Sequence, residues 1–462
     1  MELPKEYLVR MQELLGEEYP EYLDSFSKAR VTALRTNTRK ISPEELKARM
    51  PFLEESVPWA PEGFYFSGGK TKDSAQVTPA KHPYYFAGLY YLQEASAMSP
   101  GAMLPVEPGD RVLDLCGAPG GKATHLGARL AGTGVLFAND ISASRAQAMV
   151  KNLELFGIEN SYVTAETPEK LAQSFPSYFD KILVDAPCSG EGMFRRESAM
   201  VKDWVQKGPS YYQPVQREIL TSAVSMLRPG GMLLYSTCTF SREEDEDNVA
   251  WLLRTFPELT VLPLPGNRGF SEGFLPGTGR IWPQRARGEG HFLALLQKEG
   301  GGNRGKAVEE TQDWTGKQRS GRTFAEAAPD FAPLFGSAWQ DKPVSEEKDS
   351  LYLLPEGAQK RAGIRYLRTG LFLGSRKNGR FTPSPALALA LQKEDFSNRV
   401  DFSGSDGRVI RYLKGETVAC EGVPSSGEDG WTLVLVDGFP LGWAKRSKDT
   451  LKNKYHPGWR WQ

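Results

Sequence analysis

Three of the four cysteines in this 462-residue chain end apolar runs: Cys116 in VLDLCGAPGGK, Cys188 in ILVDAPCSG and Cys238 in LLYSTC. A lone cysteine in an apolar segment is usually an inert core residue. If these runs are strands of one parallel sheet, however, their ends meet at one edge, and thiols there become candidate nucleophiles. Asp185, three residues before Cys188, adds a carboxyl group to the same edge.

A glycine-rich turn follows the first of these runs. In DLCGAPGGK, Gly117, Gly120 and Gly121 allow a tight turn, and the helix expected after it leaves backbone N–H groups free for an anionic group. The turn contains neither GxGxxG nor the sequence GKT or GKS. Dinucleotides and nucleoside triphosphates are therefore poor candidates for its ligand.

Acidic residues follow the next two expected strands. Asp140 ends the strand in LFANDIS, where a carboxylate can accept hydrogen bonds from ribose hydroxyls. Together with the anion-binding turn it indicates a nucleoside cofactor with a small anionic part, a description that S-adenosylmethionine meets. Glu166, just after the third strand, either contacts the adenine edge or is a solvated loop residue.

The elements that must position these residues alternate along the chain. Apolar runs that end in Asp, Cys or Gly and precede helical stretches are typical of a parallel sheet covered on both faces. We therefore predict a doubly wound, Rossmann-like α/β core over residues 96–300, with ligands beyond the carboxyl ends of its strands. Residues 1–95 predict a small α+β domain, 301–322 a polar linker, and 323–462 a β-rich C-terminal region.

Composition narrows the function classes. Four cysteines without a CxxC pair and only four histidines argue against a zinc site or a disulfide framework and favour a reducing, cytoplasmic setting. No run approaches about 18 apolar residues, and the charged N-terminus lacks a signal-peptide core, so we expect neither a membrane span nor secretion. The formal net charge is zero, but residues 356–462 hold 18 Lys and Arg against 11 Asp and Glu. That distribution is compatible with RNA binding, although it also occurs in proteins that bind no polyanion.

A thiol beside S-adenosylmethionine points to one reaction. Carbon 5 of cytosine is not nucleophilic until a group adds to carbon 6 of the ring. Addition of a thiolate there, helped by proton donation toward ring nitrogen 3, creates a carbon that can accept a methyl group. A second base or thiol then helps to remove the carbon-5 proton and to expel the enzyme.

Longer motifs carry a family resemblance. LDLCGAPGGK, VDAPCSGEGMFRR and LLYSTCTFSREEDEDNV, with YYLQEASAMSP before them and GRIWPQRARGEGHFLALL after them, resemble the motifs of the Nop/Sun family of RNA (cytosine-5) methyltransferases. The similarity covers about residues 1–300. The basic C-terminal region resembles, more loosely, the PUA-like module of the RsmF-type ribosomal RNA enzymes of this family, through GFPLGWAKR and LKNKYHPGWRW.

The resemblance implies roles that spacing does not show. It makes Cys238 the nucleophile, Cys188 the residue that assists product release, and Asp185 the residue that hydrogen-bonds the cytosine. It also implies S-adenosylmethionine as cofactor, no metal, and small-subunit (16S) ribosomal RNA as the preferred substrate of a cytoplasmic monomer. The residues it places around the cofactor are Cys116, Gly117, Ala118, Pro119, Gly120, Gly121, Lys122, Asp140, Glu166 and Asp185. Gly117 departs from the family's usual alanine.

Other functions stay open at this point. A transfer RNA cytosine-5 methyltransferase is the nearest alternative. A DNA cytosine-5 methyltransferase would take its nucleophile from the PC motif, so the cysteine of the TC motif counts against it. A catalytically idle RNA-binding or ribosome-assembly protein would have no reason to keep Cys188, Cys238, Asp185 and the glycine turn.

Three further features are open to interpretation. Arg35 and Asn37 resemble an element of the family's N-terminal region or form an exposed basic strand end. The acidic run 242–248 is most simply the N-terminus of a helix, favoured by the helix dipole. The C-terminal aromatic residues either stack on unpaired bases beside cations or pack as core. These aromatic and basic residues are Trp443, Trp459, Trp461, Lys445, Arg446, Lys452, Lys454 and Arg460.

Overall fold

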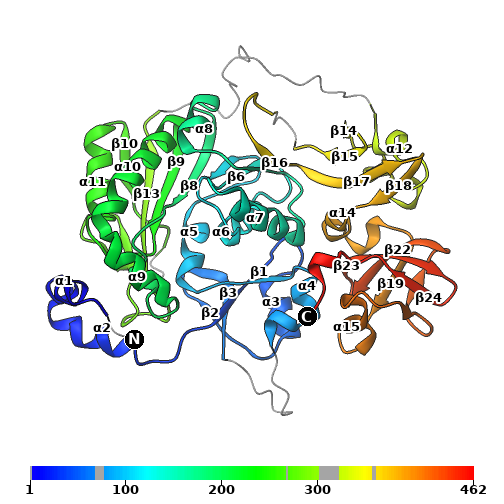
Figure 1. Cartoon of the computed structure of the whole chain (residues 1–462), viewed down its shortest axis with the longest axis horizontal. Coiled ribbons are helices and arrows are strands. Elements are labelled where there is room, and N and C mark those ends of the chain that lie inside the picture. The colour runs from blue at the N-terminus through cyan, green and yellow to red at the C-terminus, as the bar shows by residue number, and fades with distance from the viewer. Residues whose placement is uncertain (1–2, 68–77, 267–268, 301–321, 356–359) are drawn as a thin grey trace.

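A computed structural model gives the arrangement of the chain (Figure 1) and describes residues 3–67, 78–266, 269–300, 322–355 and 360–462. The predicted linker 301–322 lies outside these residues except for its last position. No helix among the described residues is long and apolar enough to cross a membrane. The described part of the chain also contains no group of three or more His, Cys, Asp or Glu side chains that could hold a metal ion.

The N-terminal region is an α+β domain, as predicted. Its antiparallel sheet has the order β2-β3-β1-β4. The helix expected in SPEELKARM is present as α3, and the Ser42 side chain caps it by accepting a hydrogen bond from the Glu45 N–H. The elements are α1 (Lys5–Leu15), α2 (Tyr19–Ser25), β1 (Ala33–Thr36), α3 (Pro43–Arg49), β2 (Leu53–Val57), β3 (Ala60–Phe66), α4 (Pro83–Phe86) and β4 (Tyr90–Leu92).

The central sheet is the predicted doubly wound core. Its order is β11-β12-β13-β9-β8-β5-β6-β7-β16, with β10 paired to β13. Strands β9, β8, β5, β6 and β7 are parallel, and β13 runs antiparallel to β9. The strands are β5 (Arg111–Asp114), β6 (Val135–Asn139), β7 (Ser161–Thr164), β8 (Phe179–Asp185), β9 (Leu227–Thr237), β10 (Leu259–Leu262), β11 (Ser271–Glu272), β12 (Gly279–Ile281) and β13 (His291–Lys298).

Helices cover both faces of this sheet and bury two separate apolar clusters. One cluster holds residues of α5, α6 and α7, and the other holds residues of α8, α10 and α11. The helices are α5 (Ser99–Met103), α6 (Gly121–Arg129), α7 (Ala143–Phe156), α8 (Pro168–Ser174), α9 (Ser198–Gln206), α10 (Gly208–Met226) and α11 (Glu246–Thr255). The chain runs from β5 to β7 on one side and from β8 to β9 on the other, so the strand order reverses between β5 and β8. Ligands bind at such a switch point.

One strand of the core sheet comes from far beyond residue 300. Strand β16 (Tyr366–Thr369) pairs antiparallel with β7 at the open edge of the sheet, and Gly370 N–H donates to the Ser161 carbonyl. An open edge presents unpaired backbone groups, and a strand from the C-terminal region satisfies them here. The division of the chain at residue 300 stays a prediction, but the C-terminal region contributes one strand to the core.

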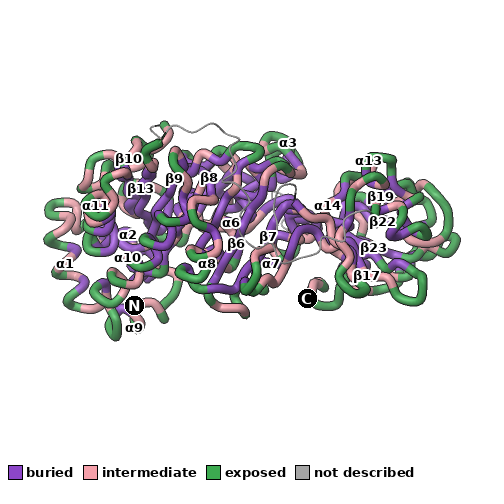
Figure 2. Tube along the Cα trace, turned by 90° about the horizontal axis from the view of Figure 1, so that it is seen from above, coloured by how far each residue is buried: buried purple, intermediate pink, exposed green. Residues whose placement is uncertain are grey.

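The rest of the C-terminal region is β-rich, as predicted. Its sheets have the orders β14-β15-β17-β18 and β20-β24-β23-β22-β19-β21. Figure 2 shows this region as a second body, joined to the core near α14. Its elements are α12 (Phe324–Ala327), α13 (Ser337–Gln340), β14 (Ser345–Glu347), β15 (Ser350–Leu353), β17 (Leu371–Lys377), β18 (Arg380–Pro383), α14 (Pro385–Ala390), β19 (Arg399–Phe402), α15 (Gly407–Leu413), β20 (Val418–Ala419), β21 (Ser425–Ser426), β22 (Gly430–Val436), β23 (Phe439–Ser447) and β24 (Thr450–Asn453).

All three of the C-terminal tryptophans have packing contacts, and Trp459 packs against two of the apolar clusters. Trp443 is buried, and its indole N–H donates to the Ser384 carbonyl at 2.8 Å, so base stacking by this residue is ruled out. Trp461 donates to the carbonyl of Lys81 at 3.0 Å and thereby ties the end of the chain to the N-terminal domain. The packing interpretation is thus correct for Trp443, because its ring fills the core of the module.

Candidate active site

The two cysteines predicted to do chemistry lie together. Cys188 follows β8 and Cys238 follows β9, and these strands are parallel neighbours in which Asp185 lies opposite Ser236. The strand ends therefore bring the two Sγ atoms to 3.4 Å from each other. The hydrogen bond with Cys238 and burial raise the pKa of the Cys188 thiol well above its usual value.

Cys116, the cysteine at the end of the first apolar run, has a different environment. Cys116 lines the neighbouring pocket described below, which Cys188 and Cys238 do not line. Burial, reinforced by the nearby carboxylates of Asp114 and Asp185, raises its pKa and keeps it a neutral thiol. The fourth cysteine, Cys420, is buried in the C-terminal region.

Asp185 is held as a carboxylate at the carboxyl end of β8. Its Oδ2 lies 2.7 Å from Lys122 Nζ, and its Oδ1 accepts a hydrogen bond from Ser236 Oγ at 2.9 Å. His291 Nε2 lies 3.3 Å from the same Oδ1. Although burial opposes ionisation, the Lys122 ammonium and the His291 ring hold the pKa of Asp185 well below its usual range. Asp185 and Lys122 therefore form an acceptor and a proton donor side by side.

A buried glutamate ties together the loops that carry the two sulfurs. Glu244 accepts hydrogen bonds from the Ser189 N–H at 2.9 Å, from the Ser189 hydroxyl, and from Gln216 Nε2 at 2.8 Å. Ser189 Oγ is in turn 2.8 Å from Thr239 Oγ1. Since Ser189 follows Cys188 and Thr239 follows Cys238, this network fixes the separation of the thiols.

A second buried glutamate connects the same loops to the N-terminal helices. Glu191 accepts hydrogen bonds from the Phe240 N–H at 3.1 Å and from Trp204 Nε1 at 2.9 Å, and it pairs with Arg10 of α1. An aromatic cluster around Phe240 and Trp282 packs α1 and α2 against this region. Helices α1 and α2 therefore support the active-site loops from outside the core.

The acidic run 242–248 leads into the first turn of helix α11, as predicted, but its central residues are buried. Helix α11 begins only at Glu246, and Glu244, Asp245 and Glu246 are all buried. Arg280 lies 2.9 Å from Asp245 and 2.6 Å from Glu246. The sequence shows the acidic residues of this run but does not show that they pair with buried Arg280, which is 34 residues away from Glu246.

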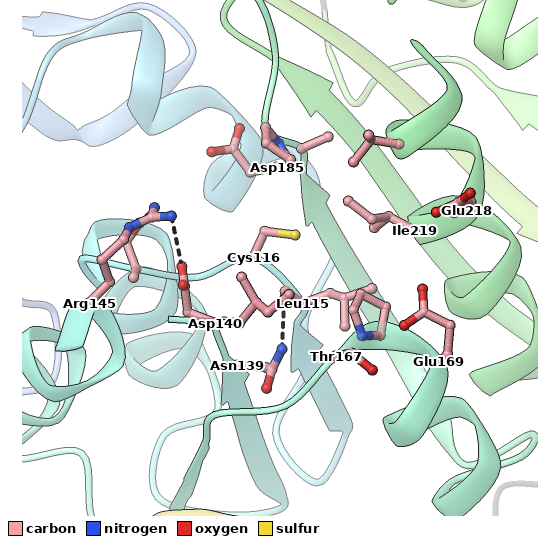
Figure 3. A pocket seen from close by; sticks show the side chains of 16 residues that line it. Leu115, Cys116, Asn139, Asp140, Arg145, Thr167, Glu169, Asp185, Glu218 and Ile219 are labelled. Carbon is pink, nitrogen blue, oxygen red and sulfur yellow. Dashed lines mark hydrogen bonds and ion pairs between the residues drawn. The ribbon is translucent and has the colours of Figure 1, made fainter. Parts of the chain in front are cut away.

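A pocket of about 470 Å³ opens beside Asp185, a size typical of small-molecule sites. Figure 3 shows Asp140 and Asp185 on the same side of it, with Cys116 between them and α10 residues opposite. Of the predicted cofactor residues, Cys116, Ala118, Asp140 and Asp185 line it. The remaining lining residues are Leu115, Asn139, Ile141, Arg145, Thr167, Pro168, Glu169, Ala186, Pro187, Val215, Glu218 and Ile219.

The glycine turn shapes one wall of this pocket. Gly120 has φ +111°, a left-handed conformation that favours glycine, and it precedes the first turn of α6. At Gly117 an added Cβ would lie 2.9 Å from the Asp114 carboxyl group. Asp114 is fully buried, and neither of its oxygens has a hydrogen-bond partner among the described residues. Its carboxyl group, whose pKa burial raises to about 8, lies just behind the turn.

These features fit S-adenosylmethionine. The pocket combines apolar walls for an adenine ring with Asp140, whose Oδ1 accepts from Ser142 N–H and whose Oδ2 lies 3.4 Å from Arg145. Asp140 is thus fixed in place to accept from ribose hydroxyls. The unpartnered Asp114 carboxyl group behind the turn is the acceptor that an amino group of the cofactor would need.

Glu166 has a different position from the one predicted. It lies outside the pocket lining, and its carboxylate accepts from the Arg365 N–H at 2.6 Å and pairs with Lys170 at 2.8 Å. The neighbouring Glu169 lines the pocket instead. The role of Glu166 at the cofactor stays a prediction, while its contact with Arg365 anchors the strand added by the C-terminal region.

Sequence reasoning missed the function of Arg35. It is neither exposed nor at a free strand end: its guanidinium is buried and donates to the Gly121 carbonyl at 2.6 Å, to Thr124 Oγ1 at 2.8 Å and to Gln93 Oε1 at 2.6 Å. Asn37 similarly donates to the carbonyls of Gly88 and Phe156. The N-terminal domain therefore holds the first turn of α6, next to the glycine turn.

Known proteins match this chain over nearly its whole length. A family model for the 16S rRNA methyltransferase RsmB/F matches residues 101–297, and models for the N-terminal domain, the first C-terminal domain and the PUA domain of RsmF match residues 3–95, 323–391 and 399–461. Ribosomal RNA small subunit methyltransferase F of Citrobacter koseri is 32% identical, covering 98% of this chain and 95% of that protein. The protein of the same name from Enterobacter sp. (strain 638) is 31% identical with the same coverage. The chain belongs to the RsmB/F family.

The resemblance stated from the motifs is thereby confirmed, with the fold class and the cofactor. The chain is an S-adenosylmethionine-dependent cytosine-5 methyltransferase of the RsmF type. A methyltransferase homolog from Pyrococcus horikoshii superposes with a TM-score of 0.55 at 30% identity, covering 64% of this chain and 95% of that one. NSun6 from the same organism, with a TM-score of 0.55 at 23% identity, shares the fold.

Proposed function

We propose that this RsmF-type chain methylates carbon 5 of a cytosine in 16S ribosomal RNA, with Cys238 adding to carbon 6. The observation that carries the mechanism is the pair of Sγ atoms 3.4 Å apart, beside a carboxylate that also lines the cofactor pocket. The relatives named as small-subunit ribosomal RNA methyltransferases support the choice of substrate.

The first step activates the ring. Cys238 Sγ forms a bond to carbon 6, and the ring electrons shift toward carbon 5 while nitrogen 3 takes up a proton. Asp185 is a carboxylate, so it accepts a hydrogen bond from the cytosine amino group and does not supply that proton. Lys122, whose Nζ lies 2.7 Å from Asp185, is the proton donor of the pair.

S-adenosylmethionine, when bound in the pocket, supplies an electrophilic methyl group. The second step then removes the proton from carbon 5 and breaks the bond between Cys238 and carbon 6. Cys188 Sγ is the nearest thiol to that bond. Two of the causes that raise the pKa of Cys188 are its hydrogen bond with Cys238 and the charge of Cys238. Both disappear once Cys238 is bound to carbon 6, so Cys188 ionises more easily at the step that needs a base.

The assignment of the nucleophile is tested by Cys238→Ala. We expect no transfer of labelled methyl from S-adenosylmethionine to a 16S RNA fragment, and no covalent complex on a denaturing gel. Cys420→Ala, which removes a buried cysteine outside the site, is the matched control and should keep the normal rate. A Cys238→Ala enzyme that methylates at the normal rate would contradict the proposal.

The substrate is tested in cells that lack the protein. Bisulfite mapping should show one or more 5-methylcytosines missing from 16S ribosomal RNA and an unchanged pattern in transfer RNA. Loss of a transfer RNA mark would make the chain a transfer RNA enzyme, and an unchanged pattern in all RNA would indicate an idle assembly protein.

A ribosomal RNA substrate implies a cytoplasmic enzyme. One chain holds every residue of the site, so we also propose a monomer, measurable by light scattering.

A further inference from the structure

We infer that a basic cleft between α2 and the start of α9 binds the phosphodiester backbone of the substrate RNA next to the target cytosine. The cleft has a volume of about 720 Å³, and Lys28, Arg30, Arg195 and Arg196 are among the residues that line it. Leu23 and Phe26 contribute apolar surface, and no carboxylate lines it. Four cations in one cleft are notable in a chain whose formal net charge is zero. The inference rests on the proposed function, because it takes RNA as the substrate.

The cations of this cleft are unequally compensated. Arg195 Nε lies 3.4 Å from buried Glu289, and Lys28 lies 3.1 Å from exposed Asp24. Arg30 and Arg196 have no carboxylate within 4.0 Å in the described part of the chain. Burial and the nearby carboxylate of Glu94 raise the pKa of Glu289, while Arg195, Arg196 and Arg30 act against that rise, so the three guanidinium groups lie near these two carboxylates. The excess positive charge is available to an anionic ligand.

The cleft adjoins the catalytic cysteines. Arg195 and Arg196 follow Cys188 in the same loop, and Gly192 N–H of that loop donates to the Cys238 carbonyl at 2.9 Å. Figure 1 shows α2 beside α9, near the carboxyl end of the core sheet. An RNA strand whose target base reaches Cys238 must continue past this loop. Arginine suits phosphate there, because its planar guanidinium can donate two parallel hydrogen bonds.

The salt dependence of RNA binding tests the inference. In single-stranded nucleic acid each phosphate contact contributes about 0.7 to the slope of log K against log salt concentration. Arg30→Ala combined with Arg196→Ala should lower the slope by about 1.4 and weaken binding at low salt roughly tenfold per arginine. Binding should weaken equally for a 16S fragment and for a scrambled RNA of the same length, because phosphates carry no sequence information.

Three comparisons keep this test decisive. Arg254→Ala, at an exposed arginine of α11 outside the cleft, should leave the slope unchanged. The double Arg→Lys variant keeps both charges and should restore most of the slope. At saturating RNA the double alanine variant should keep kcat within about threefold while its KM for RNA rises. An unchanged slope in the folded double alanine variant, or weakening limited to one RNA sequence, would overturn the inference.

Failure of the proposed function would look different. The binding measurement uses RNA alone and does not depend on methyl transfer. If the double alanine variant loses RNA affinity as expected but the wild-type enzyme methylates no cytosine, the result would contradict the proposed function and support the inference about the cleft. If the wild-type enzyme methylates its cytosine but the double alanine variant shows no change in the salt dependence of RNA binding, the result would support the proposed function and overturn the inference about the cleft.

Discussion

Replacing Glu244 by alanine should separate the loops that hold the thiols of Cys188 and Cys238. Glu244 is fully buried and accepts from the Ser189 N–H at 2.9 Å and from Gln216 Nε2 at 2.8 Å through the same oxygen, Oε2. Its other oxygen accepts from the Ser189 hydroxyl. The substitution leaves the N–H of Ser189, the residue that directly follows Cys188, buried without this acceptor. It also removes one of the two acceptors of Gln216 Nε2, which keeps its bond to the Pro187 carbonyl at 2.9 Å.

The expected cost follows from these contacts. A hydrogen bond to a charged group contributes about 1.5–3 kcal/mol, so the two bonds to Oε2 together amount to about 3–6 kcal/mol. Part of this is offset, because burial raises the pKa of Glu244 and its carboxylate is itself costly to bury. We expect a net loss of about 2–4 kcal/mol in the free energy of unfolding. A displacement of about 1 Å at the reacting groups lowers kcat about 100-fold.

Two matched variants separate geometry from charge. In Glu244→Gln the amide oxygen can take the place of Oε2 and keep both of its bonds, while the NH₂ group donates to the Ser189 hydroxyl. This variant should keep kcat within about tenfold. Glu243→Ala, at the exposed neighbouring position, should have no effect.

The assay combines three measurements: unfolding in denaturant followed by tryptophan fluorescence, single-turnover methyl transfer at saturating RNA, and calorimetric binding of S-adenosylmethionine. Cofactor affinity should stay unchanged in all variants, because Glu244 does not line the cofactor pocket. If folded Glu244→Ala transfers methyl within threefold of the wild-type rate, the reasoning that this carboxylate positions the thiols is refuted.

Three other variants test separate parts of the structure. Cys188→Ser should accumulate a covalent protein–RNA complex, seen as a shifted band on a denaturing gel, whereas free and fully methylated RNA would refute its role in release. Lys122→Met removes the main group that lowers the pKa of Asp185, so this pKa should rise. The acid limb of the pH profile of kcat/KM should therefore move to higher pH. An unmoved limb would argue against the ion pair between Lys122 and Asp185. Trp443→Ala should destabilise the C-terminal module by about 3–5 kcal/mol, measured by denaturant unfolding, and leave cofactor binding intact; loss of RNA binding without loss of stability would restore the stacking interpretation.

The parts of the site that could be predicted are those that follow from strand order. Apolar runs ending in cysteine or aspartate identify parallel strands, and parallel strands end at one edge, so the closeness of Cys188, Cys238 and Asp185 follows from the pattern alone. The supporting contacts could not be predicted, because they join segments that are distant in sequence. Arg35 binds a carbonyl 86 positions away. Glu244 lies in an acidic run that the pattern assigns to a helix start, and its burial follows only from the tertiary structure.

The carboxylate of Glu244 also offers a reason why Cys188 and Cys238 would take the different roles proposed for them. Sulfur atoms 3.4 Å apart would be equivalent if their surroundings were equivalent. Cys188 is buried, and the Glu244 charge adds to the causes that raise its pKa, while Cys238 is more exposed. Glu244 therefore disfavours a thiolate at Cys188 in the free enzyme, before RNA binds. In the proposed mechanism, the adduct removes the influence of Cys238 on the pKa of Cys188 but not that of Glu244. The loop network around Glu244 would then set both the distance between the thiols and the order in which they react.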